Sequence, residues 1–134
     1  MSSIDTIEGI GIKYARKLRK GGIRTTEALL KRGATRKGRR SLSGDLDISE
    51  KLILEWINRA DLMRVRGIGE EYSDLLEAAG VDTVKELRRR NPSSLLAKVT
   101  EINGQKSLVR RLPTASMVER WVEHAKELPD AVSY

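Results

Sequence analysis

The sequence predicts an all-α protein, and three observations support this class. Alternation of apolar and polar residues, the pattern of a half-buried strand, never continues beyond about four residues. The hydrophobic residues (39% of the chain) are mainly aliphatic, with three Tyr, two Trp and no Phe. Apolar residues recur instead at helical spacing, so we expect helices that pack through aliphatic stripes.

Composition limits the classes of protein to consider. The 134 residues suit one domain or two small repeats, and the net charge is +7 with 34% charged residues. Because the chain has no Cys, disulfides, thiolate nucleophiles and cysteine zinc sites are excluded. No run of apolar residues exceeds three, so we expect no membrane span and a cytoplasmic location.

Two helices are predicted in the middle of the chain. The Gly-rich, basic segment 33–46 is expected to hold a short helix over 36–43. A second helix is expected near 50–63, where Ser49 or Asp47 is positioned to cap its start.

Two further helices are predicted toward the C-terminus. Thr83 is positioned to cap a helix near 84–90. Ser116 and Glu119 have the spacing of a capping box, which predicts that a helix starts there. Residues 129–134 are expected to form a tail.

An internal repeat is the most informative feature of the sequence. Residues 7–30 match residues 65–88 at eight of 24 positions, and the shared residues are glycines, Thr and apolar side chains. Residues 55–60 also resemble residues 120–125, but at a spacing larger by seven. The second copy is therefore expected to contain an insertion, which we place around 101–105.

The repeat predicts two units. The first, basic unit covers residues 1–64 and the second, neutral to acidic unit covers residues 65–128. We expect each to contain a tight turn with its following helix, and then a helical pair. The two units are expected to share one core.

A Gly-Ile-Gly sequence stands at the same place in both copies. We name residues 7–11, which end in Gly9-Ile10-Gly11, glycine turn 1, and residues 65–69, which end in Gly67-Ile68-Gly69, glycine turn 2. Glycines two apart allow positive φ and a tight turn, while the central Ile anchors the turn in the core. The next helix begins with unpaired N–H groups that favour a phosphate oxygen.

These residues resemble the helix-hairpin-helix family. Gly9-Ile10-Gly11 is followed at the family's spacing by Ala15 and Leu18, and Gly67-Ile68-Gly69 by Ser73 and Leu76, with Ser in place of Ala. Almost the whole chain is also similar to a bacterial family of uncharacterised proteins with this tandem arrangement. The resemblance implies a compact helical domain of the SAM and helix-hairpin-helix type. It further implies hairpin amides that contact a DNA backbone without reading sequence, in some members with a monovalent cation held by hairpin carbonyls.

The charged residues around the first copy favour a polyanion. Residues 1–40 carry 12 Lys or Arg against three Asp or Glu. Four of the cations follow glycine turn 1 at the spacing of one helix face, and four more form a cluster shortly afterwards. The nucleic-acid-binding residues predicted with Gly9, Ile10 and Gly11 are Lys13, Arg16, Lys17 and Lys20 on the stripe and Arg36, Lys37, Arg39 and Arg40 in the cluster.

The second copy has lost every matching cation. Its equivalents of the stripe are Glu71, Asp74, Leu75 and Ala78, which would repel phosphate. Together with Gly67 and Gly69 they form the candidate surface of the alternative function, a protein-interaction adaptor. Both glycine turns also remain open to a purely structural role.

The remaining candidates for chemistry have simpler explanations. His124 is the only His and has no second ligand for a zinc site, so we expect a surface or partly buried side chain. Trp56 and Trp121 lie on apolar faces and are expected in the core. A helix-turn-helix over 36–62 is disfavoured, because its second helix is too acidic for a major groove.

The sequence therefore predicts a non-enzymatic protein that binds a nucleic-acid backbone, most simply double-stranded DNA, without sequence preference. The expected site has no metal and no catalytic residue, and no membrane partner is expected.

Overall fold

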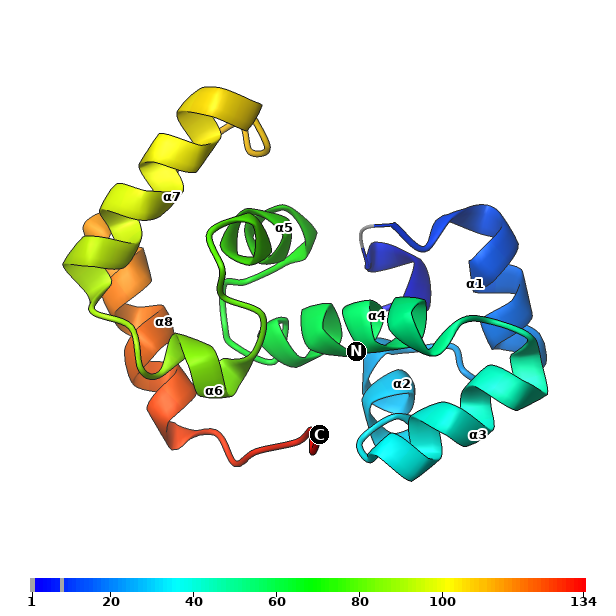
Figure 1. Cartoon of the computed structure of the whole chain (residues 1–134). Coiled ribbons are helices and arrows are strands. Elements are labelled where there is room, and N and C mark those ends of the chain that lie inside the picture. Colours follow the sequence, from blue (N-terminus) through cyan, green and yellow to red (C-terminus); the bar gives the residue numbers. More distant parts are fainter. Residues whose placement is uncertain (1, 8) are drawn as a thin grey trace. The chain divides into compact units, whose positions relative to one another are not determined.

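The computed structural model describes residues 2–7 and 9–134 and confirms the all-α class (Figure 1). The described residues form no strand beyond one isolated bridge between Ser3 and Thr25. No helix of this part of the chain is long and apolar enough to cross a membrane. The elements are the 3-10 helix η1 (Ile4–Thr6) and the helices α1 (Gly11–Lys20), α2 (Thr26–Arg32), α3 (Arg36–Leu46), α4 (Glu50–Leu62), α5 (Glu70–Ala78), α6 (Val84–Leu87), α7 (Pro92–Lys106) and α8 (Ala115–Glu127).

The contacts within the chain divide it into two compact units. Unit 1 contains Met1–Asp61 and Ala131–Tyr134, and unit 2 contains Leu62–Asp130. The division falls in the last helical turn of α4, three residues before the expected one. A core shared by both units stays a prediction.

Unit 1 packs η1 against α1 and α2 against α3. Ala15 and Leu18 of α1 are fully buried, as their helical spacing predicts. On α4, Trp56 is only 2% exposed, and its ring centroid lies 5.2 Å from that of Tyr14 at an interplanar angle of 59°. Tilted ring pairs at this distance are favourable, so the core role expected for Trp56 is confirmed.

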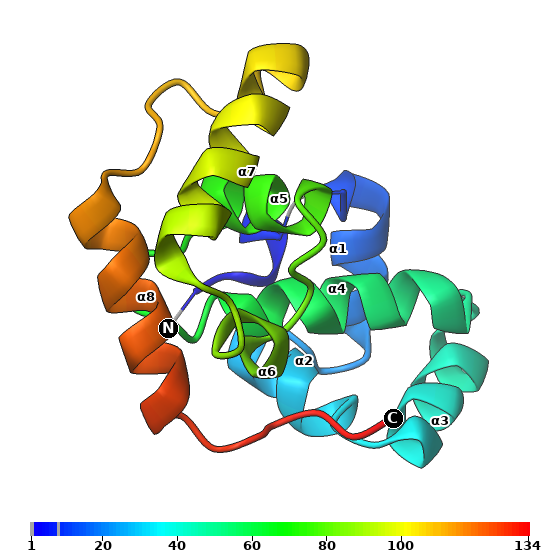
Figure 2. The same cartoon turned by 60° about the vertical axis from the view of Figure 1, so that its left-hand side comes forward.

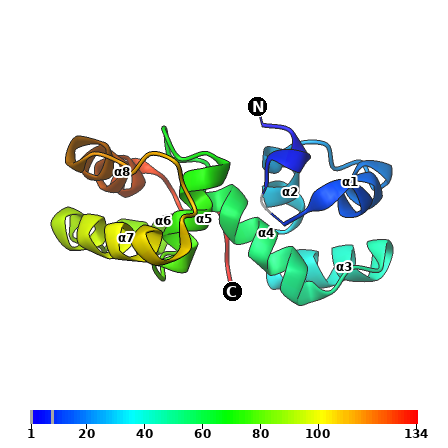
Figure 3. The ribbon, with the colours of Figure 1, turned by 90° about the horizontal axis from the view of Figure 1, so that it is seen from above.

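Unit 2 repeats this arrangement with α5 to α8. Helix α7 packs along α8, and α5 packs against α7 (Figures 2 and 3). Trp121 of α8 is 2% exposed, and its ring centroid lies 5.1 Å from that of Tyr72 at 55°. Since both ring pairs join equivalent positions, the structural repeat extends to the last helix of each unit, as the similarity of 55–60 to 120–125 predicted.

The connection before the last helix is short in unit 1. Helix α3 ends at Leu46, and its C-cap residue Asp47 adopts the left-handed conformation with φ 53°. The next residue, Ile48, is buried and bonds through its backbone to Ser43. Ser49 follows at once and caps α4 by accepting a hydrogen bond from the Leu52 N–H at 3.2 Å.

The corresponding connection in unit 2 is longer. Ser107 follows α7 with φ 50°, and the buried Val109 bonds through its backbone to the side chain of Asn103. Four residues, 110–113, then separate Val109 from the cap Thr114. Helix α7 is also four residues longer than α3, so the insertion expected around residues 101–105 is divided between the end of α7 and the segment after it.

Side chains cap six of the eight α-helices. Ser49 and Thr83 act as predicted, and α3 starts at Arg36 as expected but runs three residues further, to Leu46. The capping box predicted at Ser116 is wrong. Thr114 caps α8 by accepting the Met117 N–H at 3.1 Å, and Ser116 already lies within the helix.

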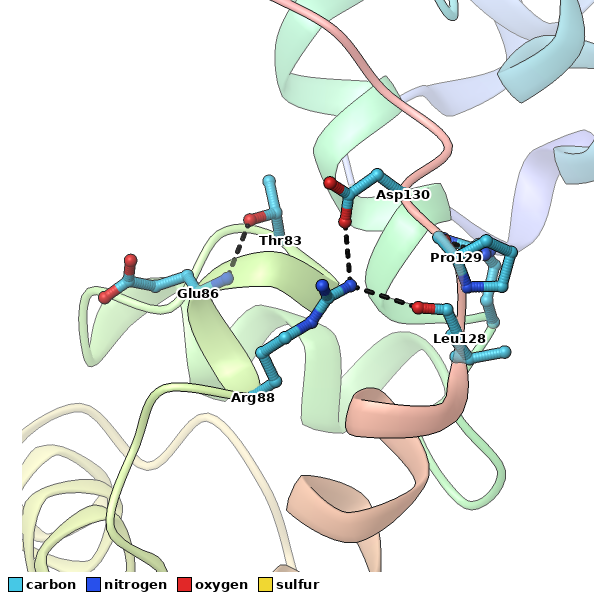
Figure 4. Close-up of polar contacts among 7 residues, drawn as sticks. Thr83, Glu86, Arg88, Leu128, Pro129 and Asp130 are labelled. Carbon is cyan, nitrogen blue, oxygen red and sulfur yellow. Dashed lines mark hydrogen bonds and ion pairs between the residues drawn. The ribbon is translucent and has the colours of Figure 1, made fainter.

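Three arginines hold the C-terminal segment, which contains no helix. In unit 2, Arg88 donates from Nη2 to the Leu128 carbonyl at 3.1 Å and to the Asp130 carboxylate at 2.8 Å (Figure 4). Arg64 donates to the Pro129 carbonyl at 2.6 Å. In unit 1, Arg39 donates to the Ser133 carbonyl at 2.8 Å.

The cap assignment is tested by a pair of alanine substitutions. Thr114→Ala removes the acceptor of an N-terminal amide of α8 and should lower the free energy of unfolding by about 1 kcal/mol, whereas Ser116→Ala should have little effect. Urea denaturation of both variants measures the difference. Equal losses in the two variants would contradict a cap at Thr114.

Candidate nucleic-acid interface

Glycine turn 1 has the conformation that its sequence predicts. The Ile10 N–H donates to the Ile7 carbonyl at 3.3 Å, and both isoleucines are buried. Gly9 has φ 89° and Gly11 has φ 66°, values that L side chains rarely adopt. A Cβ at either glycine would meet no atom within 4 Å, so the outer face of the turn is open.

Glycine turn 2 closes in the same way but differs at both glycines. The Ile68 N–H donates to the Val65 carbonyl at 3.1 Å, and Gly67 has φ 90°. A Cβ on Gly67 would lie 2.9 Å from Nε1 of Trp121, so the indole backs this turn. Gly69 has φ −104°, and the positive φ expected there is wrong, because the residue is the extended N-cap of α5.

Neither helix that follows a glycine turn has a side-chain cap. No side chain of a described residue caps α1 or α5. Each of the other six α-helices has a Ser, Thr or Asn whose side chain accepts a hydrogen bond from an N-terminal amide. The first amides of α1 and α5 therefore have no side-chain acceptor within the described part of the chain, and such amides favour an external anion.

The charges beside these two open helix ends are opposite. The first helical turn of α5 contains Glu70 and Glu71, which complement the helix dipole. The first helical turn of α1 contains no acidic residue and includes Lys13. Of these two first helical turns in the described part of the chain, that of α1 combines open amides with a positive charge that attracts phosphate.

The cation stripe of α1 forms as predicted, with one restriction. Lys13, Arg16 and Lys20 are exposed, and their side chains have no ion pair with any described residue. Lys17 is half-buried, and its Nζ donates to the Asp47 carbonyl at 3.2 Å. Three side chains of the stripe are therefore available to a ligand, and the fourth links α1 to the end of α3.

A fifth cation of α1 faces another direction. Arg19 forms an ion pair with Asp5 at 3.3 Å and contacts the Ser3 hydroxyl at 3.4 Å, which joins α1 to the residues around η1. Hydrogen bonding from the Ser3 side chain and from the Arg19 guanidinium lowers the pKa of the Asp5 carboxyl.

The second group of predicted cations lies at the start of α3. Arg36 and Lys37 are exposed, and no ion pair engages them within the described residues. Arg40 is also exposed and lies 3.8 Å from the Glu50 carboxylate. A surface pair of this kind is weak, so Arg40 can exchange its partner for a phosphate.

Arg39 does not belong to this surface. It is 5% exposed, and its guanidinium donates to the Gly33 and Ser133 carbonyls at 2.8 Å each and lies over the Tyr134 ring. The prediction of a phosphate contact at Arg39 is corrected, because the residue fixes the C-terminal segment to unit 1.

The two groups of cations lie at separate places on unit 1. Helix α1 meets α3 at the C-terminal ends of both helices, where the Leu46 side chain packs on Gly21 and a hollow of about 450 Å³ contains Lys17 and Lys20. Arg36 and Lys37 begin α3, eleven residues long and therefore about 16 Å from end to end (Figure 1). They would contact different phosphates from those at α1.

The candidate protein-binding residues of unit 2 are only partly exposed. Glu71 is exposed, and Asp74 and Ala78 are half-buried. Leu75 is 1% exposed and belongs to the core of unit 2, so its expected role in contacting a partner is corrected. Without Leu75, this face of α5 has no large apolar side chain to offer.

A groove of about 490 Å³ lies between glycine turn 2 and α8. His124 is half-buried there, as expected, and its Nδ1 accepts the Arg66 N–H at 3.1 Å. No group of three His, Asp or Glu side chains in residues 2–7 and 9–134 is placed to hold a metal ion. The Ile7 and Val65 carbonyls each accept an amide of their own turn, and we assign no cation to them.

Ile12 is a surface residue that sequence reasoning missed. It lies between Gly11 and Lys13 and is 75% exposed, unusually high for a large apolar side chain. It stands three residues before the buried Ala15, so helical spacing alone does not predict its exposure.

A family model described as "Domain of unknown function (DUF4332)" matches residues 8–128. The chain belongs to this family. The DUF4332 match includes both glycine turns and all eight α-helices, so the repeat lies within one family region. No solved structure matches the chain.

Substitution of the glycines tests the geometry of the turns. Gly67→Ala should lower the free energy of unfolding by about 2 kcal/mol or more, because it combines positive φ with a clash against Trp121. Gly9→Ala should lower the free energy of unfolding by about 1–2 kcal/mol, because it introduces a side chain at positive φ without a clash. Gly69→Ala should lower it by less than about 1 kcal/mol. Thermal and urea unfolding measure the series, and an equal or larger loss at Gly69 would contradict the geometry of glycine turn 2.

The Asp5 carboxyl provides a test by pH. Its pKa should lie below the ordinary value of 3.8, and both Ser3→Ala and Arg19→Gln should raise it. The pKa of the Asp5 carboxyl is lower in the folded state than in the unfolded state. The carboxylate therefore stabilises the fold at pH values above its pKa in the unfolded state, and this stabilisation is lost as the pH falls through its pKa in the folded state. NMR titration of the Asp5 carboxyl carbon measures both, and a midpoint at or above 3.8 would exclude the contacts.

Proposed function

We propose that the chain binds the phosphate backbone of nucleic acid through unit 1, without sequence preference and without catalysis. The observation that carries this proposal is the start of α1. There, amides with no side-chain cap adjoin open glycines and the exposed side chains of Lys13 and Arg16, and the first helical turn of α1 contains no acidic residue. Together these groups offer hydrogen-bond donors and positive charge to one phosphate and its neighbours.

The cations at the start of α3 support the same role. Positive side chains are unfavourable near a helix N-terminus, where the dipole is already positive. Arg36 and Lys37 nevertheless occupy the first helical turn of α3, and no acidic residue balances them there. Their presence costs helix stability, which an anionic ligand would offset.

We further infer that both glycine turns are helix-hairpin-helix copies. In support, Gly9 and Gly67 share positive φ, and the small residues Ala15 and Ser73 are both buried. The leading element differs between the copies, since the short η1 precedes turn 1 and the long α4 precedes turn 2. Double-stranded DNA is the ligand that this inference favours, and a cytoplasmic location follows from that role.

Charge reversal on α1 tests the proposal. The three exposed cations of the α1 stripe and Arg36 and Lys37 of α3 have no ion pair with the described residues, so these five should contribute about −4 to the slope of log K against log[salt]. Lys13→Glu with Arg16→Glu should abolish binding at roughly 50 mM salt, because it replaces attraction by repulsion beside the α1 amides. Fluorescence anisotropy with duplex DNA, single-stranded DNA and RNA measures binding.

Two control variants separate this site from net charge. Lys31→Glu with Lys51→Glu makes the same change in charge at exposed positions of α2 and α4, and it should weaken binding much less. Glu71→Gln should not weaken it at all. If the wild-type chain forms no complex with any of the three ligands, or if both double variants lose binding equally, the proposed site is wrong.

A further inference from the structure

We propose that unit 2 carries a second phosphate-backbone contact, formed by Arg110 and Arg111 in the segment inserted after α7. This inference rests on the proposed function and extends it to a part of the molecule whose own glycine turn is acidic. The partner is the same class of ligand, the backbone of a nucleic acid.

The connection that contains the two arginines is longer than its counterpart in unit 1. Unit 1 makes the equivalent connection with Ile48 followed directly by the cap Ser49, whereas unit 2 places Arg110-Arg111-Leu112-Pro113 between Val109 and the cap Thr114. Pro113 is buried and Leu112 is 37% exposed. The two arginines therefore have no counterpart in unit 1.

Both arginines are directed to solvent. Their residues are exposed, and neither side chain makes a hydrogen bond or an ion pair with the described part of the chain. Lys106, four residues earlier, ends α7 and is explained by the negative end of the helix dipole. No such explanation applies to Arg110 and Arg111, which lie outside any helix.

The backbone that carries the arginines is fixed from both sides. Asn103 donates to the Val109 carbonyl at 3.2 Å and accepts the Val109 N–H at 2.9 Å. The Tyr72 hydroxyl donates to the Arg111 carbonyl at 3.0 Å, which ties the segment to α5 (Figure 2 shows the segment between α7 and α8). Because the backbone is ordered before binding, a ligand has to order only two side chains.

The inserted segment supplies positive charge that α5 lacks. The α1 stripe has no counterpart on α5, where Glu71 and Asp74 stand in place of Lys13 and Arg16. Arg111 is joined through its carbonyl to Tyr72, which directly follows Glu71. Positive charge thus enters unit 2 from another element, whose backbone is bonded to the start of α5.

A double substitution in the full chain tests this contact. Arg110→Ala with Arg111→Ala should make the salt slope on a long DNA duplex shallower by about two, and equally so on two unrelated sequences. Arg110→Lys with Arg111→Lys keeps both charges and should restore the wild-type slope. Lys85→Ala with Arg89→Ala removes two exposed charges from the α6 region of unit 2 and should leave the slope nearly unchanged.

The outcomes separate this inference from the proposed function. If the wild-type chain binds and the Arg110/Arg111 double variant keeps its slope, the second contact is absent although unit 1 binds. An equal reduction in the Lys85/Arg89 variant also overturns it, since the effect would then be one of net charge. A wild-type chain that binds no nucleic acid overturns the proposed function itself. Circular dichroism of each variant verifies that it is folded.

Discussion

Each unit depends on the packing of one tyrosine against one tryptophan. Tyr14 and Tyr72 stand three residues after the second glycine of their turns, and Trp56 and Trp121 stand in the last helix of their units. The nearly equal ring geometries, 5.2 Å at 59° and 5.1 Å at 55°, fix the helix after each turn to the core. In unit 2 the same pair has two further tasks, because Trp121 backs Gly67 and Tyr72 holds the Arg111 carbonyl.

The same frame therefore carries two different surfaces. Buried glycine-turn isoleucines, small helix residues and ring pairs are shared, while the solvent-facing positions differ in sign of charge. In unit 1 the first helical turn of α1 contains Lys13 and no acidic residue, and in unit 2 that of α5 contains two glutamates. The electrostatics of the surface, and not the glycine turn alone, distinguishes the two units as candidate phosphate sites.

Features that depend on local geometry were predictable from the sequence. The helical class, the cap Thr83 and the positive φ of Gly9 follow from residue type and spacing. Burial of a side chain by segments that are distant in the sequence was not predictable in this way. Arg39 looks like one more surface cation until Ser133, 94 residues away, supplies a carbonyl for it. Leu75 takes the place of a stripe lysine, yet the core of unit 2 encloses it.

The start of α8 shows a second limit of sequence reasoning. Ser116 and Glu119 have the spacing of a capping box, but Thr114 competes for the same role two residues earlier. The sequence pattern does not determine which of the two residues caps α8, because the start of the helix depends on where Val118 and Trp121 are buried in the core. Likewise, the insertion could be counted from the repeat, but only the left-handed ends of α3 and α7 locate it.

Because Ala131–Tyr134 belong to unit 1, that unit is discontinuous in sequence and unit 2 is inserted within it. During synthesis from the N-terminus, all of unit 2 emerges before unit 1 has its last residues. Until Ser133 arrives, the Arg39 guanidinium lacks one of its two carbonyl partners and the Ala34 carbonyl lacks the Ser133 amide. The order in which the ribosome delivers these segments makes the unit that starts the chain the last to be completed.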